Sequence, residues 1–153
     1  MAHLTIINHA STQALDWIHE IQSEMHLPQE QSAYAALRAV LHTLRDRLPV
    51  KEAADLGGQL PTFVRGIYYE GWSPTGKPEK LRNETDFMQK VIDTMQNHAE
   101  VNAGNAARAV FALLDRHVSH GEIDDVISVL PIGLRGLWPE HAVARAGGVR
   151  KAG

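Results

Sequence analysis

Apolar residues in the first half of the chain recur every three or four positions, the spacing of a helix that buries one face. One stripe covers residues 15–25 and ends before Pro28, and a longer stripe covers residues 34–48 and ends before Pro49. Because proline disfavours helical backbone at the residue that precedes it, both prolines mark helix ends. We therefore predict two helices, followed by a third and shorter helix over residues 50–58.

The same pattern returns in the second half of the chain. Residues 87–95 and 110–118 carry helical stripes, and Ser119 and Glu122 have the spacing of a capping box at a helix start. In the first half, a fourth segment begins near Pro61, where a missing amide hydrogen costs little in the first turn of a helix. No stretch alternates apolar and polar residues over a useful strand length. The prediction is an all-α fold.

The two halves align when the sequence is shifted by 70 positions and laid on itself. ALRAVLHTLRDRL, which starts at Ala36, falls on AARAVFALLDRHV, which starts at Ala106. LPTFVRGIY from Leu60 falls on LPIGLRGLW from Leu130, in the same register and without a gap. We expect a helical bundle built from two tandem, similar four-segment helical repeats, related by a pseudo-twofold axis and forming one globular domain.

Five segments follow from this alignment and from the composition between the halves. They are an N-terminal arm (1–10), a first helical repeat (11–72), a Pro/Gly/Lys linker (73–82), a second helical repeat (83–140) and a mobile basic tail (141–153).

Composition narrows the classes of protein to which this chain can belong. A hydrophobic content of 44% and a charged content of 22% are typical of a globular domain with a wetted surface. A net charge of −3 gives no reason to expect a nucleic-acid partner, and no apolar run is long enough to predict a membrane span. The lack of cysteine excludes disulfides and thiolate sites, and together with the lack of a signal peptide it favours the cytoplasm.

The repeated segments resemble a known bacterial family. ALRAVLHTLRDRLPVKEAADLGGQLPTFVRGIYYEGW, the later DFMQKV and then ARAVFALLDRHVSHGEIDDVISVLPIGLRGLW are similar to DUF2267 proteins, roughly over residues 11–140. The resemblance implies a helical domain without an assigned activity, so it carries no catalytic residue over to this chain. Some relatives join this domain to ligand-sensing modules such as CBS pairs, which implies regulation rather than chemistry.

Two short patterns suggest chemistry, and neither has the right context. Residues 71–77 have the G-x-x-x-x-G-K spacing of a phosphate-binding loop, but Pro78 follows where that motif needs a hydroxyl. His117 and His120, with Glu122 nearby, could supply zinc ligands, yet their spacing straddles a predicted helix end. No nucleophile-elbow sequence is present. We expect surface histidines, no metal, no cofactor and no enzymatic activity.

Arginines and acids recur at matching positions of the two repeats. The arginines are Arg65 and Arg135, and the acids in the short helices before them are Glu52, Glu122, Asp55 and Asp125. One interpretation is a symmetric anion clamp, because guanidinium groups bind phosphates and carboxylates through paired hydrogen bonds. The other is a set of structural salt bridges that lock adjacent helices together. We favour the salt bridges, because a structural element must be built in both copies whereas a site needs only one.

The end of the first repeat differs from the end of the second, with IYYEGW where the second has LWPEHA. Its aromatic and basic residues are Tyr68, Tyr69, Trp72, Lys77, Lys80 and Arg82. Aromatic anchors beside cations are typical of protein contact sites. The interpretation that we favour is that the aromatics seal the join between the repeats while the cations keep the linker in water.

The sequence thus favours a non-catalytic helical module that binds a protein partner or a second copy of itself. Residues 68–82 are the predicted contact surface. The alternative is a small-ligand or anion sensor that uses Arg65 and Arg135 between the two halves.

Overall fold

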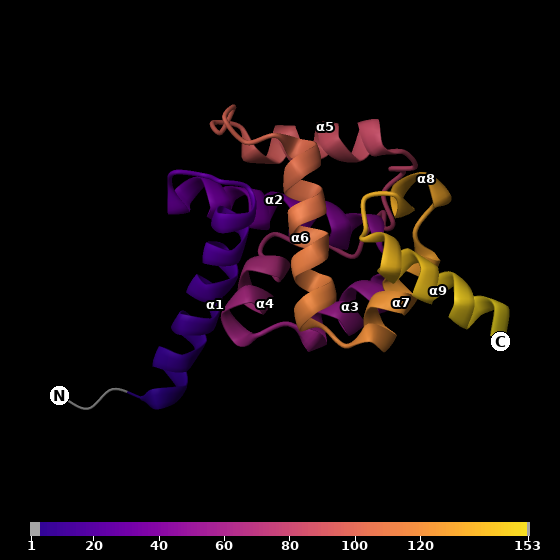
Figure 1. Cartoon of the computed structure of the whole chain (residues 1–153), viewed down its shortest axis with the longest axis horizontal. Coiled ribbons are helices and arrows are strands. Elements are labelled where there is room, and N and C mark those ends of the chain that lie inside the picture. The colour runs from indigo at the N-terminus through magenta and orange to yellow at the C-terminus, as the bar shows by residue number, and fades with distance from the viewer. Residues whose placement is uncertain (1–3, 153) are drawn as a thin grey trace.

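The computed structural model describes the backbone of residues 4–152 and the side chains of residues 4–147. Within that range the chain is helical and contains no strand, which confirms the predicted fold class. The first half holds α1 (Thr5–Glu24), α2 (Glu30–Arg47), α3 (Val50–Gln59) and α4 (Thr62–Tyr69). The second half holds α5 (Glu84–Met95), α6 (Ala103–His117), α7 (His120–Val129), α8 (Ile132–Arg135) and α9 (Glu140–Ala152) (Figure 1).

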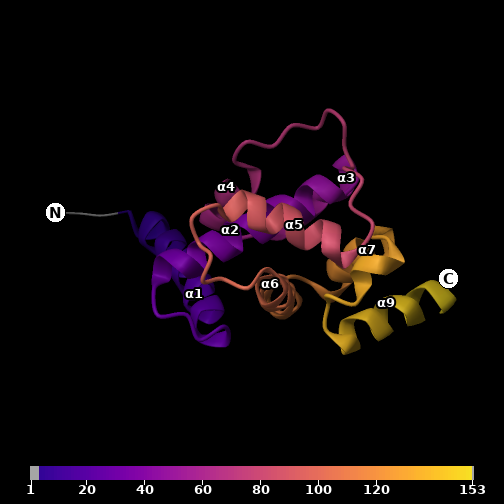
Figure 2. The same cartoon turned by 90° about the horizontal axis from the view of Figure 1, so that it is seen from above.

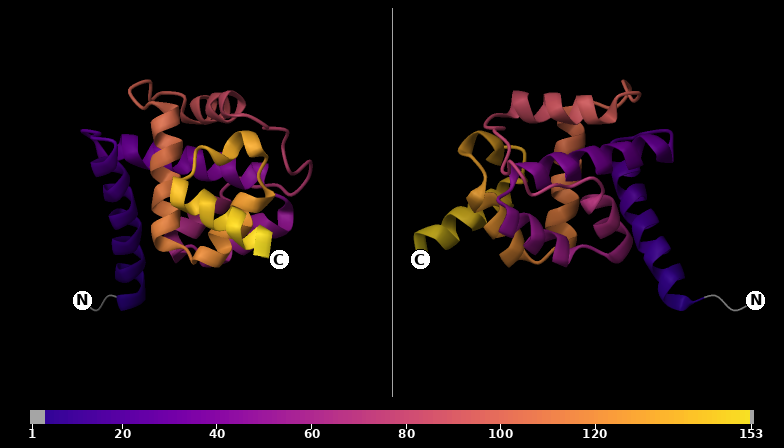
Figure 3. Two further views of the ribbon diagram at one scale, coloured as in Figure 1. Left: turned by 45° about the vertical axis from the view of Figure 1, so that its right-hand side comes forward. Right: turned by 180° about the vertical axis from the view of Figure 1, so that it is seen from behind.

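The long helices α2 and α6 cross at the centre of the molecule (Figures 1 and 2). Both α1 and α5 pack against each of these central helices, α3 packs against α7, and α9 lies along α7. The N-terminal half of α1 runs outward from this body and stands clear of the other helices (Figure 3).

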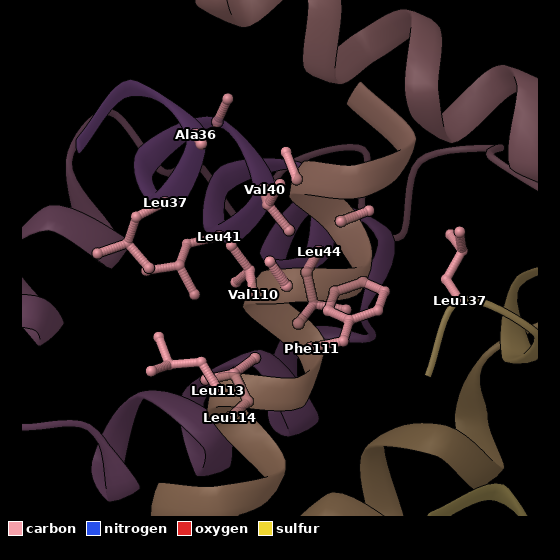
Figure 4. Packing of buried hydrophobic residues seen from close by; sticks show 14 of the residues in the cluster. Ala36, Leu37, Val40, Leu41, Leu44, Val110, Phe111, Leu113, Leu114 and Leu137 are labelled. Carbon is pink, nitrogen blue, oxygen red and sulfur yellow. The ribbon is translucent and has the colours of Figure 1, made fainter. Parts of the chain in front are cut away.

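One hydrophobic core joins the two halves of the chain. Leu41 and Leu44 of α2 face Val110 and Leu114 of α6, and all four side chains are fully buried (Figure 4). Burial of such a side chain contributes about 1.5–3 kcal/mol to folding. Because α2 and α6 each bury their apolar stripe on the other, neither repeat has a complete core of its own.

The helices α1 and α5 are each followed by a non-glycine residue with a positive φ. His26 has φ 54° after α1, and Gln96, at the matching position of the second repeat, has φ 52° after α5. The amide of His26 donates to the carbonyl of Ser23 (3.2 Å), and the amide of Leu27 donates to that of Gln22 (2.9 Å). This pair of bonds is the Schellman motif, which ends α1 with a left-handed residue.

The helices α3 and α7 occupy matching positions of the two repeats, and α7 begins as its sequence predicts. The Ser119 hydroxyl accepts a hydrogen bond from the amide of Glu122 (3.3 Å), which satisfies one of the free donors of the first turn.

The two ends of the chain are more ordered than the sequence indicated. The helix α1 begins at Thr5, so the predicted arm over residues 1–10 is helical from that residue on. The predicted mobile tail over residues 141–153 lies mostly within α9. Residues 1–3 of the predicted arm and residue 153 of the predicted tail lie outside the described residues.

The position of α9 is set by a buried charge cluster. Arg145 donates to the carboxylates of Asp124 (2.7 Å) and Asp115 (2.9 Å), while Ala142 and Ala146 are buried on the same side of the helix. Hydrogen bonds from Arg145 and His141 lower the pKa of Asp115 despite the opposing effect of burial. The segment is therefore part of the fold, at least as far as Ala146.

The connection between α4 and α5 is irregular but is held in place by α2 and α5 (Figure 2). Arg47 donates to the carbonyl of Leu81 (2.8 Å), and the amide of Glu79 donates to the carbonyl of Asp46 (2.8 Å). The ammonium group of Lys90 bridges the carboxylates of Asp46 (3.0 Å) and Glu79. No helix follows the G-x-x-x-x-G-K stretch directly, so its backbone does not have the context of a phosphate-binding loop.

Candidate functional site

The repeated arginines bind main-chain carbonyls at the ends of helices. Arg65 donates to the carbonyls of Gly57 (2.8 Å) and Leu60 (2.9 Å), at the end of α3. Arg135 donates to those of Leu130 and Ser128 (both 3.2 Å), at the end of α7. The last carbonyls of a helix lack partners and carry partial negative charge, so they attract a nearby guanidinium group. We predicted that these arginines form salt bridges with the acids of α3 and α7. In the structure each arginine instead caps the C-terminal end of one of these helices.

Three of the four repeated acids lie close to one another, and neither Arg65 nor Arg135 pairs with them. One carboxylate oxygen each from Glu52, Asp55 and Glu122 lies within 4.8 Å of the others. Glu52 and Glu122 occupy matching positions of the packed helices α3 and α7, and one oxygen of each is buried without a hydrogen-bond partner. Asp125, the fourth acid, is exposed.

Burial and the neighbouring acids raise the pKa of Glu122 to about 8. Burial is the largest cause, followed by the close contact with the Glu52 carboxyl group and by the charges of Glu52, Asp55 and Asp125. A carboxyl group this close to other acids cannot ionise at low cost, so Glu122 keeps its proton at neutral pH.

Carboxylate oxygens are also the ligands that hard divalent cations prefer, so these three acids are the residues that could hold a metal. The Lys51 ammonium already pairs with Asp55 (2.7 Å), and the proton that Glu122 keeps accounts for the close approach of Glu52 and Glu122. Of the two histidines weighed from the sequence, His120 is exposed and His117 contacts another helix. His117 binds Glu20 (2.6 Å) and its ring lies 4.9 Å from that of Trp17.

A serine, a histidine and a glutamate converge beside the start of α2, but their order is wrong for nucleophilic catalysis. The buried Ser32 hydroxyl donates to Glu100 (2.9 Å), and the same carboxylate oxygen contacts His98 Nδ1 (3.1 Å). A serine nucleophile needs the histidine, not the acid, on its hydroxyl. The cluster instead attaches the connection before α6 to α2.

The aromatic part of the predicted contact surface lies largely inside the protein. Tyr68 is fully buried and donates to the carbonyl of Ala53 (2.7 Å). Tyr69 packs so closely on Gly57 that a Cβ there would lie 2.2 Å from its hydroxyl, and the half-buried ring of Trp72 lies 5.6 Å from that of Tyr69. These side chains attach α4 to α3 within the first repeat.

The basic part of that surface is divided. The Lys77 side chain is 12% exposed and pairs with Glu79 (3.3 Å). Lys80 and Arg82 are exposed on the linker. Of the six predicted contact residues, only these two are exposed.

A different group of apolar side chains lies open, between α1, α2 and α4. Leu15, Tyr34 and Phe63 are 46%, 39% and 54% exposed. Tyr34 borders a hollow of about 170 Å³ with Leu15 and Ile18, and a hollow of about 390 Å³ with Phe63 and Ile67. We call these five residues the Tyr34 surface. Exposed large side chains that share hollows mark contact sites more often than apolar residues scattered singly do.

The three open residues are peculiar to the first repeat. Leu15, Tyr34 and Phe63 correspond to Thr85, Gly104 and Gly133 in the second repeat. Sequence reasoning placed Leu15 and Tyr34 in apolar stripes and took them for core. The difference between the copies is the signal that could have found them, because a core position needs an apolar residue in both.

In the second repeat, backbone atoms of the same repeat cover Gly133, the position that corresponds to the exposed Phe63 of the first repeat. A Cβ at Gly133 would lie 2.4 Å from the carbonyl oxygen of Arg82 and 3.4 Å from the Cα of Asn83. Gly133 belongs to α8, so these distances place residues 82 and 83, which directly precede α5, against α8. In the first repeat the matching residues, Thr12 and Gln13, lie within α1 and leave Phe63 exposed.

Comparisons with known proteins identify the family of the chain but assign no activity to it. No curated protein matches the chain. Among the described residues, no helix combines the length and the apolar character that a membrane crossing requires. The model of one family, described as an uncharacterized conserved protein (DUF2267), matches residues 15–137, which include α2 to α8 and the C-terminal half of α1. The chain therefore belongs to the DUF2267 family.

Proposed function

We propose that this chain is a non-catalytic interaction or regulatory module that binds a protein through the Tyr34 surface. The observation that carries the proposal is the exposure of Leu15, Tyr34 and Phe63 in one repeat, at positions where the other repeat has small or polar residues. An apolar group left in water is costly unless a partner covers it. We assign the module to the bacterial cytoplasm, from the family resemblance and the lack of cysteine.

We further propose that the two repeats are related by a pseudo-twofold axis that passes near the Glu52–Glu122 contact. In a twofold arrangement, residues on the axis meet their own counterparts. Glu52 and Glu122 are such counterparts, and so are α3 and α7, which pack together. The contact of α1 with α6 is likewise matched by that of α5 with α2.

The alternative of an anion sensor has less support. Both of its arginines already use their guanidinium groups on the carbonyls at the ends of α3 and α7. An anion bound between Arg65 and Arg135 would have to compete with those bonds, which we expect to weaken its binding.

Affinity capture with matched variants tests the proposed function. The test variant carries Tyr34→Ser and Phe63→Ser, and the control carries Ile132→Ser, which removes an 82% exposed isoleucine outside the Tyr34 surface. We expect the wild type and the control to retain the same discrete protein partner, and the test variant to lose at least about 90% of it. Equal recovery by all three proteins, with unchanged circular dichroism, would rule out the Tyr34 surface as the contact.

A further inference from the structure

Residues 5–9 of α1 are exposed, and Ala10, Ser11 and Gln13 are only half-buried. None of residues 5–13 is buried, and Leu4, Ile6 and Ile7 are 67%, 74% and 59% exposed. Short helices are only marginally stable in water unless one face packs on another surface. We call residues 4–13 the α1 arm, and we expect its apolar face to be covered in the working protein.

The chemistry of the arm restricts what can cover it. Residues 4–13 contain no aspartate, glutamate, lysine or arginine. A charged surface would have to give up hydration without gaining an opposite charge in return. The arm therefore matches an apolar surface whose neighbouring charges are already paired.

The Tyr34 surface has that property. At its edges the Arg38 guanidinium pairs with Glu70 (2.9 Å), and the imidazole of His19 contacts Glu30. These contacts engage charged groups that border the apolar surface. Arm and surface are complementary in polarity, and both are present in every copy of the chain.

The second repeat indicates how such a surface is covered. There the residues directly before α5 lie against α8 at Gly133. In the first repeat the matching residues 12–13 belong to α1, whose N-terminal end runs outward from the body of the molecule (Figure 3). The α1 arm of another molecule can pack on Phe63, which the α1 helix of its own chain leaves exposed.

We propose that the partner at the Tyr34 surface is a second copy of this chain, whose α1 arm packs on Phe63 and its neighbours. The inference rests on the proposed function and names its partner. Each copy contributes one arm and one surface, so the exchange is reciprocal and gives a closed twofold dimer.

Sedimentation equilibrium with complementary variants tests the exchange. The arm variant carries Ile6→Ser and Ile7→Ser, the surface variant carries Phe63→Ser, and Ile132→Ser is the control. We expect the wild type and the control to dimerise, and each of the two variants to dimerise at least about tenfold more weakly. A mixture of the arm and surface variants keeps one intact arm–surface contact, so we expect it to form more dimer than either variant alone.

Three outcomes would overturn the inference. They are a monomeric wild type up to about 200 µM, far above the Kd of a specific dimer, a mixture no better than its components, and dimers that survive Phe63→Ser. If the wild type is monomeric while capture of another protein still depends on Tyr34 and Phe63, only the choice of partner fails. If neither dimerisation nor capture depends on those residues, the proposed function fails as well.

Discussion

At the scale of single residues, the contact between Glu52 and Glu122 makes the junction of α3 and α7 sensitive to pH. The pKa of Glu122 rises from 4.5 to about 8, mainly through burial and then through the neighbouring Glu52. The folded state therefore holds its proton more tightly than the unfolded chain does. The stabilisation from this proton is complete below pH 4.5 and is lost as the pH rises through 8.

We predict that Glu122→Gln removes this pH dependence. Glutamine keeps the shape and can donate a hydrogen bond to Glu52 without a proton to lose. At pH 9 the variant should be more stable than the wild type by about 1–2 kcal/mol, a value reduced from the full linkage because part of each carboxyl lies in water. Urea unfolding followed by circular dichroism from pH 4.5 to 9 measures the difference.

Asp125→Asn is the matched control for that experiment. It removes an exposed carboxylate that contributes least among the acids that raise the pKa of Glu122, so its unfolding curve should keep most of the pH dependence of the wild type. Parallel curves for Glu122→Gln and the wild type would show that the proton on Glu122 does not stabilise the fold.

The sequence predicted the acids but not their partners. Glu52 and Glu122 stood out because they recur at matching positions, yet we assigned them to Arg65 and Arg135. Recurrence reveals that a residue matters in both copies, but it does not show whether matching residues meet their own counterparts across an axis. The contact between α3 and α7 decides this, and it depends on how the two halves pack.

At the scale of helices, Arg65 and Arg135 hold the ends of α3 and α7. Each comes from the following helix and turns back to the carbonyls that the preceding helix leaves open. This accounts for the recurrence of the arginine in both repeats without requiring a ligand.

We predict that Arg65→Ala destabilises the protein by about 1–2 kcal/mol, because charge-assisted hydrogen bonds to the end of α3 are lost. Arg135→Ala should act in the same direction through α7. Thermal unfolding with and without inorganic phosphate measures both effects, and the loss caused by Arg65→Ala should be the same in either buffer. An anion clamp would instead give a phosphate-dependent rise in Tm for the wild type that Arg65→Ala abolishes.

Helix positions were predictable to a large extent, and the C-terminal helix was not. The apolar stripes and the prolines placed the end of α2 and both ends of α3 within one residue of their observed positions, but α2 begins at Glu30, four residues before the predicted stripe. The segment of α9 contains two adjacent glycines and no clear apolar stripe, so nothing local indicates a helix. Its anchor is Arg145, which reaches Asp115 and Asp124 on other helices, a contact that only the tertiary structure reveals.

At the scale of the whole molecule, the two repeats share a core but differ in what covers them. The linker lies over Gly133 in the second repeat, whereas Phe63 in the first is open and α1 continues outward. Periodicity marked Leu15 and Tyr34 as apolar positions, but it could not tell a buried edge of a stripe from an exposed one. The contact surface that we predicted at residues 68–82 does not include these positions, and its aromatic side chains pack between α3 and α4.

Site-specific photo-cross-linking tests the central claim most directly. A photoreactive amino acid is placed at position 63 in one protein and at position 132 in another, and each is irradiated in living cells. We predict one discrete cross-linked protein from position 63, with peptides of the α1 arm at the junction, and none from the exposed position 132. An absence of adducts at position 63, or the same diffuse set of adducts at both positions, would contradict the claim that the Tyr34 surface binds a protein.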